Sequence, residues 1–142
     1  MKIYLAGPLF TKAEQEFNSK LDEILRMLGY IVFLPQDECK GLDDSIDIFE
    51  KCLAGLDISN VVVAILDGSD ADSGTCWEVG YAYAKNKPVF AIRTDFRQSG
   101  DTFGFNAMLF HSSSYICTGS NYLKRLKESL KTYSDQKEKA TL

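Results

Sequence analysis

A short segment with two carboxylates, Asp72 and Glu78, has the residue types and spacing for chemistry on a sugar. It reads DSGTCWEVG over residues 72–80 and follows the run NVVVAIL at residues 60–66. A run that is short, β-branched and almost wholly apolar is typical of a parallel strand buried on both faces. A helix over residues 75–85 is expected next, because Asp72 or Ser73 can accept hydrogen bonds from its first free N–H groups.

Glu78 is expected in the first turn of that helix, where the positive end of the helix dipole keeps a carboxylate ionised at neutral pH. An ionised carboxylate held at the carboxyl end of a parallel strand is suited to nucleophilic attack on a sugar carbon. A second interpretation stays open, since acidic residues in first turns often do no more than complement the dipole.

The rest of the chain alternates between apolar runs and helical stripes. Further strands are expected at residues 2–6, 30–34, 88–92 and 114–117, and further helices at residues 11–28, 45–56 and 123–133. The polar residues 134–142 are expected to fray. Strands that alternate with helices predict a parallel sheet. At 142 residues, we expect a single α/β domain with a flavodoxin-like three-layer sandwich around a five-stranded parallel sheet.

Ligands of such sheets bind beyond the carboxyl ends of the strands. Residues 6–10, residues 67–78 and the stretch from Arg93 onward are expected to meet at this edge. The carboxylates, an amide and flat aromatic faces found there suit an uncharged sugar attached to a planar base; the residues beyond the two acids are Tyr4, Phe10, Trp77 and Asn106. For Phe10 and Trp77, packing in the core is the alternative interpretation.

Several classes of function are not expected. The first turn, AGPLF, has no glycine-rich phosphate motif, and Pro8 removes a backbone donor. A phospho-receiver would need an acidic cluster after the first strand and a lysine after the fifth, and neither is present. The net charge of −4 and the pI near 5.0 argue against a nucleic-acid polymer as partner. No bilayer-length apolar stretch or signal-peptide pattern is found, so a cytoplasmic protein without a membrane partner is expected.

The metal-binding and reactive residues are sparse. Four cysteines, at positions 39, 52, 76 and 117, are irregularly spaced, and His111 is the only histidine. This pattern predicts neither a metal site nor a histidine-based triad. The thiols are expected to be free, with Cys39 and Cys117 acting as small buried hydrophobes.

Charged residues in the loops after the third and fourth strands have simple interpretations. Asp67 and Asp70 are interpreted as turn formers. Arg93 and Arg97 are interpreted as members of surface ion pairs, with ligand binding as the alternative.

Three motifs, taken in order, resemble the nucleoside 2-deoxyribosyltransferase family. They are YLAGPLF at residues 4–10, D-x-G-T-x-x-E-x-G-Y-A from Asp72, and N-x-M from Asn106 to Met108. The resemblance implies transfer of a 2-deoxyribosyl group from one nucleobase to another, with retention at the anomeric carbon. Deoxynucleosides and free nucleobases would be the small-molecule partners, and no cofactor is implied.

The resemblance also implies a role for each matching residue. Glu78 would be the nucleophile that forms a covalent deoxyribosyl-enzyme, Tyr4 would orient it, and Asp72 would contact the substrate and help proton transfer. Gly7, Phe10 and Trp77 would line the pocket, with Phe10 beside the base. Asn106 and Met108 match residues that complete the pocket of a neighbouring subunit, which implies a dimer or hexamer.

The match has one departure and leaves alternatives open. Cys52 stands where well-known relatives carry a base-binding acid, although its apolar stripe favours a packing role. Asp37 is either a substitute for that acid or a turn residue. One rival function is hydrolysis of deoxynucleoside 5′-monophosphates, with the serines at positions 112–114 as phosphate donors. The other rival is a non-catalytic nucleoside-binding domain.

Overall fold

The structure is a computed structural model that describes residues 1–97 and 100–140. Its five strands pair in parallel in the order β2–β1–β3–β4–β5. This order and the all-parallel pairing confirm the predicted flavodoxin-like α/β sheet. The strands are β1 (Lys2–Ala6), β2 (Ile31–Phe33), β3 (Val61–Ile65), β4 (Val89–Arg93) and β5 (Tyr115–Thr118).

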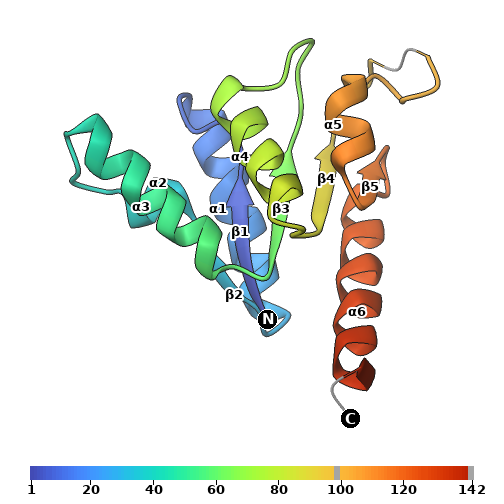
Figure 1. Ribbon diagram of the computed structural model, residues 1–142. Coiled ribbons are helices and arrows are strands. Elements are labelled where there is room, and N and C mark those ends of the chain that lie inside the picture. The colour runs from blue at the N-terminus through green and yellow to red at the C-terminus, as the bar shows by residue number, and fades with distance from the viewer. Residues whose placement is uncertain (98–99, 141–142) are drawn as a thin grey trace.

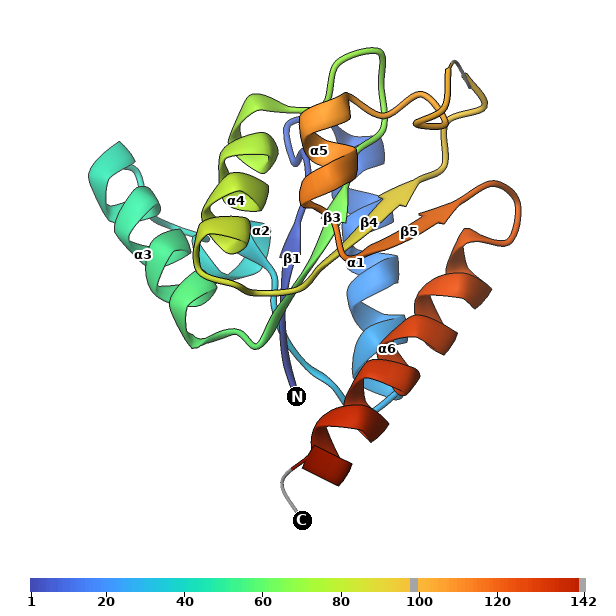
Figure 2. The same ribbon diagram turned by 45° about the vertical axis from the view of Figure 1, so that its right-hand side comes forward.

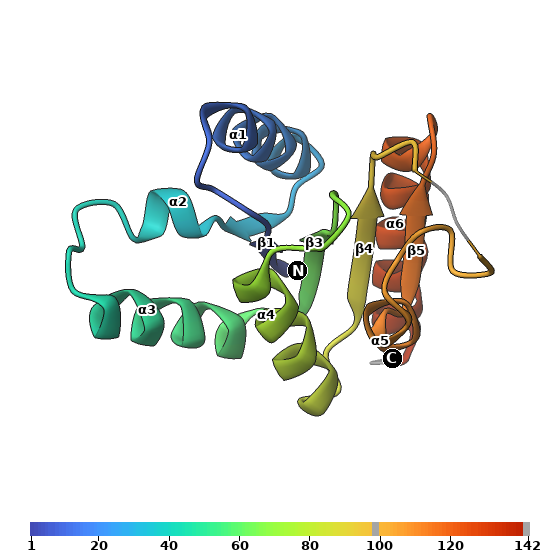
Figure 3. The same cartoon turned by 90° about the horizontal axis from the view of Figure 1, so that it is seen from above.

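Helices cover both faces of the sheet (Figures 1 and 2). One apolar core lies between the sheet and the helices α1 (Lys12–Met27) and α6 (Tyr122–Ala140). A second core lies between the sheet and three other helices, α3 (Ser45–Ile58), α4 (Ser73–Ala84) and α5 (Ala107–Ser112). Seen from above, the one-turn helix α2 (Pro35–Glu38) and α3 lie together beyond the β2 side of the sheet (Figure 3).

Local capping explains where the helices begin. The Thr11 hydroxyl accepts from the Glu14 N–H, and the Glu14 side chain accepts from the Thr11 N–H, so the capping box at α1 is present. At α4, Asp72 is the cap, and the helix therefore begins at Ser73, two residues earlier than predicted. As a result, the prediction that Glu78 lies in the first turn is wrong, because six helical residues from Ser73 place it in the second turn.

Two C-terminal features differ from the sequence expectations. The helix α5 had no counterpart among the predicted elements. The helix α6 continues to Ala140, so residues 134–140 of the expected frayed tail are helical, and residues 141–142 lie outside the described residues. Within the described chain, none of the helices combines the length and apolar character needed to cross a membrane.

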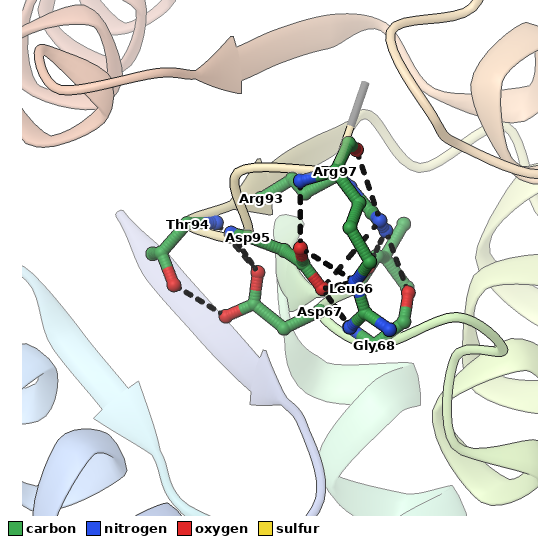
Figure 4. A network of polar contacts seen from close by, with 7 residues as sticks. All are labelled: Leu66, Asp67, Gly68, Arg93, Thr94, Asp95 and Arg97. Atoms are coloured by element: carbon green, nitrogen blue, oxygen red, sulfur yellow. Dashed lines mark hydrogen bonds and ion pairs between the residues drawn. The ribbon is translucent and has the colours of Figure 1, made fainter. Parts of the chain in front are cut away.

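Polar contacts tie the loop after β3 to the loop after β4 (Figure 4). Asp67 accepts from the Thr94 N–H at 2.5 Å, from the Thr94 hydroxyl at 2.7 Å and from the Asp95 N–H at 3.0 Å. Asp95 in turn accepts from the Gly68 N–H at 3.2 Å. The interpretation of Asp67 as a simple turn former is therefore wrong, because its carboxylate joins two loops.

Arg93 completes this network from the end of β4. It is 3% exposed and donates to the carbonyl oxygens of Leu66 and Gly68, both at 3.0 Å. The interpretation of Arg93 as a surface residue is wrong, because its buried guanidinium binds these carbonyl oxygens after β3 and lies 3.6 Å from Asp95, although its Nε has no hydrogen-bond partner among the described residues. The exposed Arg97 does pair with Asp95 as expected, and this pairing lowers the pKa of Asp95.

Candidate active site

Tyr4 and Glu78 form the polar centre of the site. Tyr4 lies in the middle of β1, is fully buried, and stacks on Phe33 of β2 with ring centroids 5.2 Å apart. Its hydroxyl donates to Oε1 of Glu78 over 2.5 Å. No further hydrogen bond to this carboxylate is found within the described chain, so Oε2 is the oxygen left for other contacts.

Burial controls the charge of Glu78. The half-buried carboxyl has its pKa raised to about 7, mainly by burial and additionally by the charge of Asp72, while the Tyr4 hydrogen bond acts in the opposite direction. The expectation of a fully ionised Glu78 at neutral pH is therefore wrong. Its physical basis was the helix dipole, whose effect is confined to the first turn, and Glu78 lies beyond it.

Asp72 has a defined structural role beside this pair. Its Oδ2 accepts from the Thr75 N–H and from the Thr75 hydroxyl, both at 2.9 Å. These bonds cap α4 and fix the carboxylate at the carboxyl end of the sheet. Because the charge of Asp72 raises the pKa of Glu78, the two acids are electrostatically coupled.

The two flanks of α4 carry different groups. Trp77, Glu78 and Tyr81 are on the α3 flank, where Trp77 lies 5.7 Å from the Phe49 ring and stacks on Tyr81 at 5.3 Å between centroids. Trp77 remains 49% exposed, so it is not a core residue. The indole of Trp77 and the ring of Tyr81 form a partly exposed aromatic surface on this flank.

A cavity of about 770 Å³ occupies the opposite flank, between α4 and α5. Asn106 and Met108 line it, together with Cys76, Gly80 and Tyr83 of α4. The structure therefore does not bring Asn106 and Met108 to the Glu78 of the same chain. Asn106 caps α5 by accepting from the Met108 N–H at 2.9 Å, and the Met108 side chain is 79% exposed.

The loop after β1 holds the other predicted pocket residues. Phe10 is 77% exposed, which excludes the core-packing alternative. Its backbone N–H donates to Glu14 at 3.0 Å and so fixes the loop to α1. Gly7 has a steric role, since a Cβ there would lie 2.9 Å from Cδ1 of Ile65. The loop can pass this close to β3 only without a side chain.

Asp37 lies on the short helix α2, whereas Tyr4 and Glu78 lie on β1 and α4. It is exposed on the single turn of α2, where its N–H donates to the Leu34 carbonyl oxygen at 3.0 Å. This position agrees with the interpretation of Asp37 as a local turn residue.

Sequence reasoning missed the surroundings of the Tyr4 ring. Phe33 stacks on it, and Cys52 of α3 packs in the same apolar core. The Cys52 sulfur also lies 3.6 Å from that of Cys39. The Tyr4 pKa is raised by burial first, and then by Glu78 and Cys52. The only sequence signal was the departure from the family pattern at position 52.

Comparisons with known proteins identify the family and the fold. A family profile described as nucleoside 2-deoxyribosyltransferase matches residues 3–110. A conserved protein from Enterococcus faecalis V583 has a TM-score of 0.74 and 30% identity, with 91% of this chain and 98% of that chain covered. A 2-deoxyribosyltransferase from Bacillus psychrosaccharolyticus has a TM-score of 0.72 and 25% identity, with 87% and 89% covered.

A more distant structure shows how widely the fold is used. A CMP N-glycosidase from Clostridium botulinum has a TM-score of 0.66 and 15% identity, with 94% of this chain and 99% of that chain covered. No curated protein matches the chain. The family profile covers well over half of the sequence and includes Tyr4, Asp72 and Glu78. The chain therefore belongs to the nucleoside 2-deoxyribosyltransferase family.

Proposed function

We propose that this protein transfers the 2-deoxyribosyl group between nucleobases through a covalent intermediate on Glu78. The observation that carries the proposal is the Tyr4–Glu78 contact, in which a buried hydroxyl holds one carboxylate oxygen. A carboxylate held in this way is positioned to stabilise the positive charge that develops on a sugar when its N-glycosidic bond breaks.

The reaction has two displacements. First, Glu78 attacks C1′, the bond from C1′ to the base nitrogen breaks, and the leaving base takes up a proton from solvent, a transfer that Asp72 would assist by accepting the incoming proton and passing it to the base nitrogen. A second base then attacks C1′, the bond to Glu78 breaks, and the surplus proton returns to solvent by the same route. Two inversions at C1′ give net retention.

The raised pKa of Glu78 fits a nucleophile that changes charge during the cycle. At a pKa of about 7, the carboxylate form that attacks is substantially populated at neutral pH. Burial also makes this anion less solvated, and so more reactive toward a developing cation. Protonated Glu78 cannot attack, so activity is expected to rise as the pH passes through about 7.

The placement of Asn106 and Met108 supports an oligomeric site. Both lie across α4 from the Glu78 of their own chain, beside the cavity with Gly80 and Tyr83. The exposed Met108 side chain is available to a second copy. We therefore infer that a neighbouring subunit supplies these residues to each Glu78.

The first turn and the serine cluster give little support to the monophosphate hydrolase. The Thr11 hydroxyl is used in the α1 cap, and Lys12 extends toward Glu16 at 3.8 Å with 91% of its side chain exposed. The hydroxyls of Ser112 and Ser113 both donate to the Leu109 carbonyl oxygen. A phosphate near Asp72 and Glu78 would also meet two acidic groups.

One experiment tests the proposal against both rivals. The protein is incubated with deoxyinosine and adenine, and separately with deoxynucleoside 5′-monophosphates. The proposal expects deoxyadenosine plus hypoxanthine in the first reaction, and a trapped peptide with deoxyribose on Glu78. Release of base from monophosphates without transfer would favour the hydrolase. Binding of deoxynucleosides without turnover, unchanged by Glu78→Gln, would favour the non-catalytic domain.

A further inference from the structure

Two cysteines, Cys39 at the end of α2 and Cys52 in α3, lie in contact with each other. Cys39 follows the last residue of α2, and Cys52 lies in the middle of α3. Their sulfur atoms are 3.6 Å apart, and both side chains are half-buried free thiols. The adjacent residues Glu38 and Lys51 form an ion pair at 3.6 Å between the same two elements. The thiol contact is thus part of a defined α2–α3 junction.

This thiol pair is connected to the catalytic centre through Tyr4. Cys52 packs against the cluster that contains Tyr4 and is one of the groups that raise its pKa. Tyr4 in turn holds Glu78 through the 2.5 Å hydrogen bond. The sequence Cys39, Cys52, Tyr4, Glu78 is therefore a continuous series of contacts.

We propose that Cys39 and Cys52 are an oxidisable dithiol site, and that a disulfide between them regulates the Tyr4–Glu78 centre. The regulatory part rests on the proposed function, whereas formation of the disulfide does not. The oxidant is a small-molecule disulfide of the glutathione type. One protein thiolate attacks it and releases one small thiol, and the second cysteine then displaces the other small thiol. Two protein thiols are oxidised, and one small disulfide is reduced to two thiols.

The geometry explains why oxidation of the two cysteines would affect the Tyr4–Glu78 pair. The sulfurs must close from 3.6 Å to a bond of roughly 2.0 Å, which draws Cys52 toward Cys39. This movement changes the group packed beside the Tyr4 hydroxyl. The stacked Phe33 ring limits movement of the Tyr4 ring, so the change acts on the surroundings of the Tyr4 hydroxyl, which holds Glu78.

The environment of the thiols makes disulfide formation slow and the resulting disulfide hard to reduce. Burial, and then the contact with Cys52, raises the pKa of Cys39 to about 12, with Glu38 raising it further and Lys51 lowering it. Little reactive thiolate is present at neutral pH, so exchange is slow. A dithiol whose thiolate form is disfavoured also gives a disulfide that is harder to reduce.

The test uses the full chain and oxidised glutathione. After incubation, free thiols are alkylated, and peptides are identified by mass. We expect a Cys39–Cys52 cross-linked peptide, and roughly a tenfold loss of transfer activity that dithiothreitol reverses, since small displacements at a reacting centre are costly. Cys39→Ser should abolish both effects. Cys117→Ala, which changes a buried cysteine on β5 in the core on the other face of the sheet, should leave both effects unchanged.

A second readout separates this inference from the proposed function. The titration of Glu78, followed by carbon NMR on labelled protein, should shift when the disulfide forms, whether or not the chain transfers deoxyribose. A protein that forms the disulfide and shifts Glu78 but shows no transfer would count against the proposed function alone. The inference is overturned if no Cys39–Cys52 peptide forms, or if it forms without moving the Glu78 titration.

Discussion

The Tyr4 hydroxyl donates to Oε1 of Glu78 over 2.5 Å and joins the first strand of the sheet to the helix that follows the third. The donor is fully buried, whereas the acceptor is half-buried at the edge of the sheet. This bond lowers the pKa of Glu78 against the larger effect of burial. The balance between burial and this hydrogen bond sets how the stability and the activity of the protein depend on pH.

Glu78→Gln should change how stability depends on pH. The folded chain holds the Glu78 proton more tightly than the unfolded chain, because its pKa rises from 4.5 to about 7 on folding. Stability from this group is therefore full below pH 4.5, and it is lost as the pH rises to about 7. The loss over this whole range is on the order of 3 kcal/mol. The free energy of unfolding, measured with urea at pH 5 and at pH 8, should fall more between these two pH values for the wild type than for Glu78→Gln. An equal fall in both proteins would contradict the raised pKa of Glu78.

Tyr4→Phe should move the acidic limb of the activity profile to higher pH. The substitution removes the hydrogen bond that favours ionised Glu78, so the pKa of Glu78 rises further above its ordinary value. The phenyl ring keeps its stacking on Phe33, and the fold should be retained. We expect kcat to fall by roughly tenfold or more, since a positioned donor at a charged centre is lost. An unshifted pH–rate profile would show that the bond does not tune Glu78.

Two substitutions at Asp72 separate its charge from its capping role. Asn is an effective helix cap, so Asp72→Asn should keep α4 stable, whereas Asp72→Ala should cost about 1 kcal/mol. Both remove a negative charge that raises the pKa of Glu78, and both should move the acidic limb to lower pH. Thermal unfolding and pH–rate profiles measure the two effects. Equal stability of the two variants would argue against the cap in which Asp72 accepts from the Thr75 N–H.

Arg93→Met should be strongly destabilising. The substitution leaves Asp95 without its buried partner and the carbonyl oxygens of Leu66 and Gly68 without a donor. Asp95 keeps the exposed Arg97 as a partner, so most of the cost comes from the two carbonyl oxygens that lose their donor. Arg97→Met is the matched control, because Arg97 pairs with the same Asp95 from an exposed position. The free energy of unfolding from chemical denaturation should be much lower for Arg93→Met than for Arg97→Met. Similar values would mean that the loop network contributes little to stability.

Met108→Ala should impair transfer without unfolding the chain. Its side chain is 79% exposed, so stability should change by less than about 0.5 kcal/mol. Met27→Ala is a control of similar exposure, at 78%, near the end of α1. Coexpression of Met108→Ala with Glu78→Gln should restore activity above either variant alone, because one mixed site then carries both native residues. Failure to restore activity would indicate that each chain uses its own Met108.

The parallel sheet and its helices were predictable from the sequence because the patterns that indicate them are local. The apolar runs at β1, β3 and β4 fix a buried parallel sheet, and the Thr11–Glu14 box marks the start of α1. The pairing of Tyr4 with Glu78 followed from the family motif, and the structure brings these two side chains into contact. These features depend on residue type and spacing along the chain.

The features that were missed depend on neighbours far away in sequence. Arg93 has the sequence character of an exposed residue, and the carbonyl oxygens after β3 together with the Asp95 carboxylate make its burial favourable. The charge of Glu78 depends mainly on its burial in the folded protein, and an argument from the helix dipole alone does not include burial. The contact of Cys39 with Cys52 requires α2 and α3 to be folded against each other.

The bond between Tyr4 and Glu78 spans 74 positions of the chain. It forms only after β1 has inserted beside β3 and the chain has passed through two earlier crossovers. Such a long-range contact is completed late, because its loop-closure entropy must be overcome first. Partly folded or truncated chains would therefore lack the assembled centre, and turnover would report on molecules whose sheet is complete.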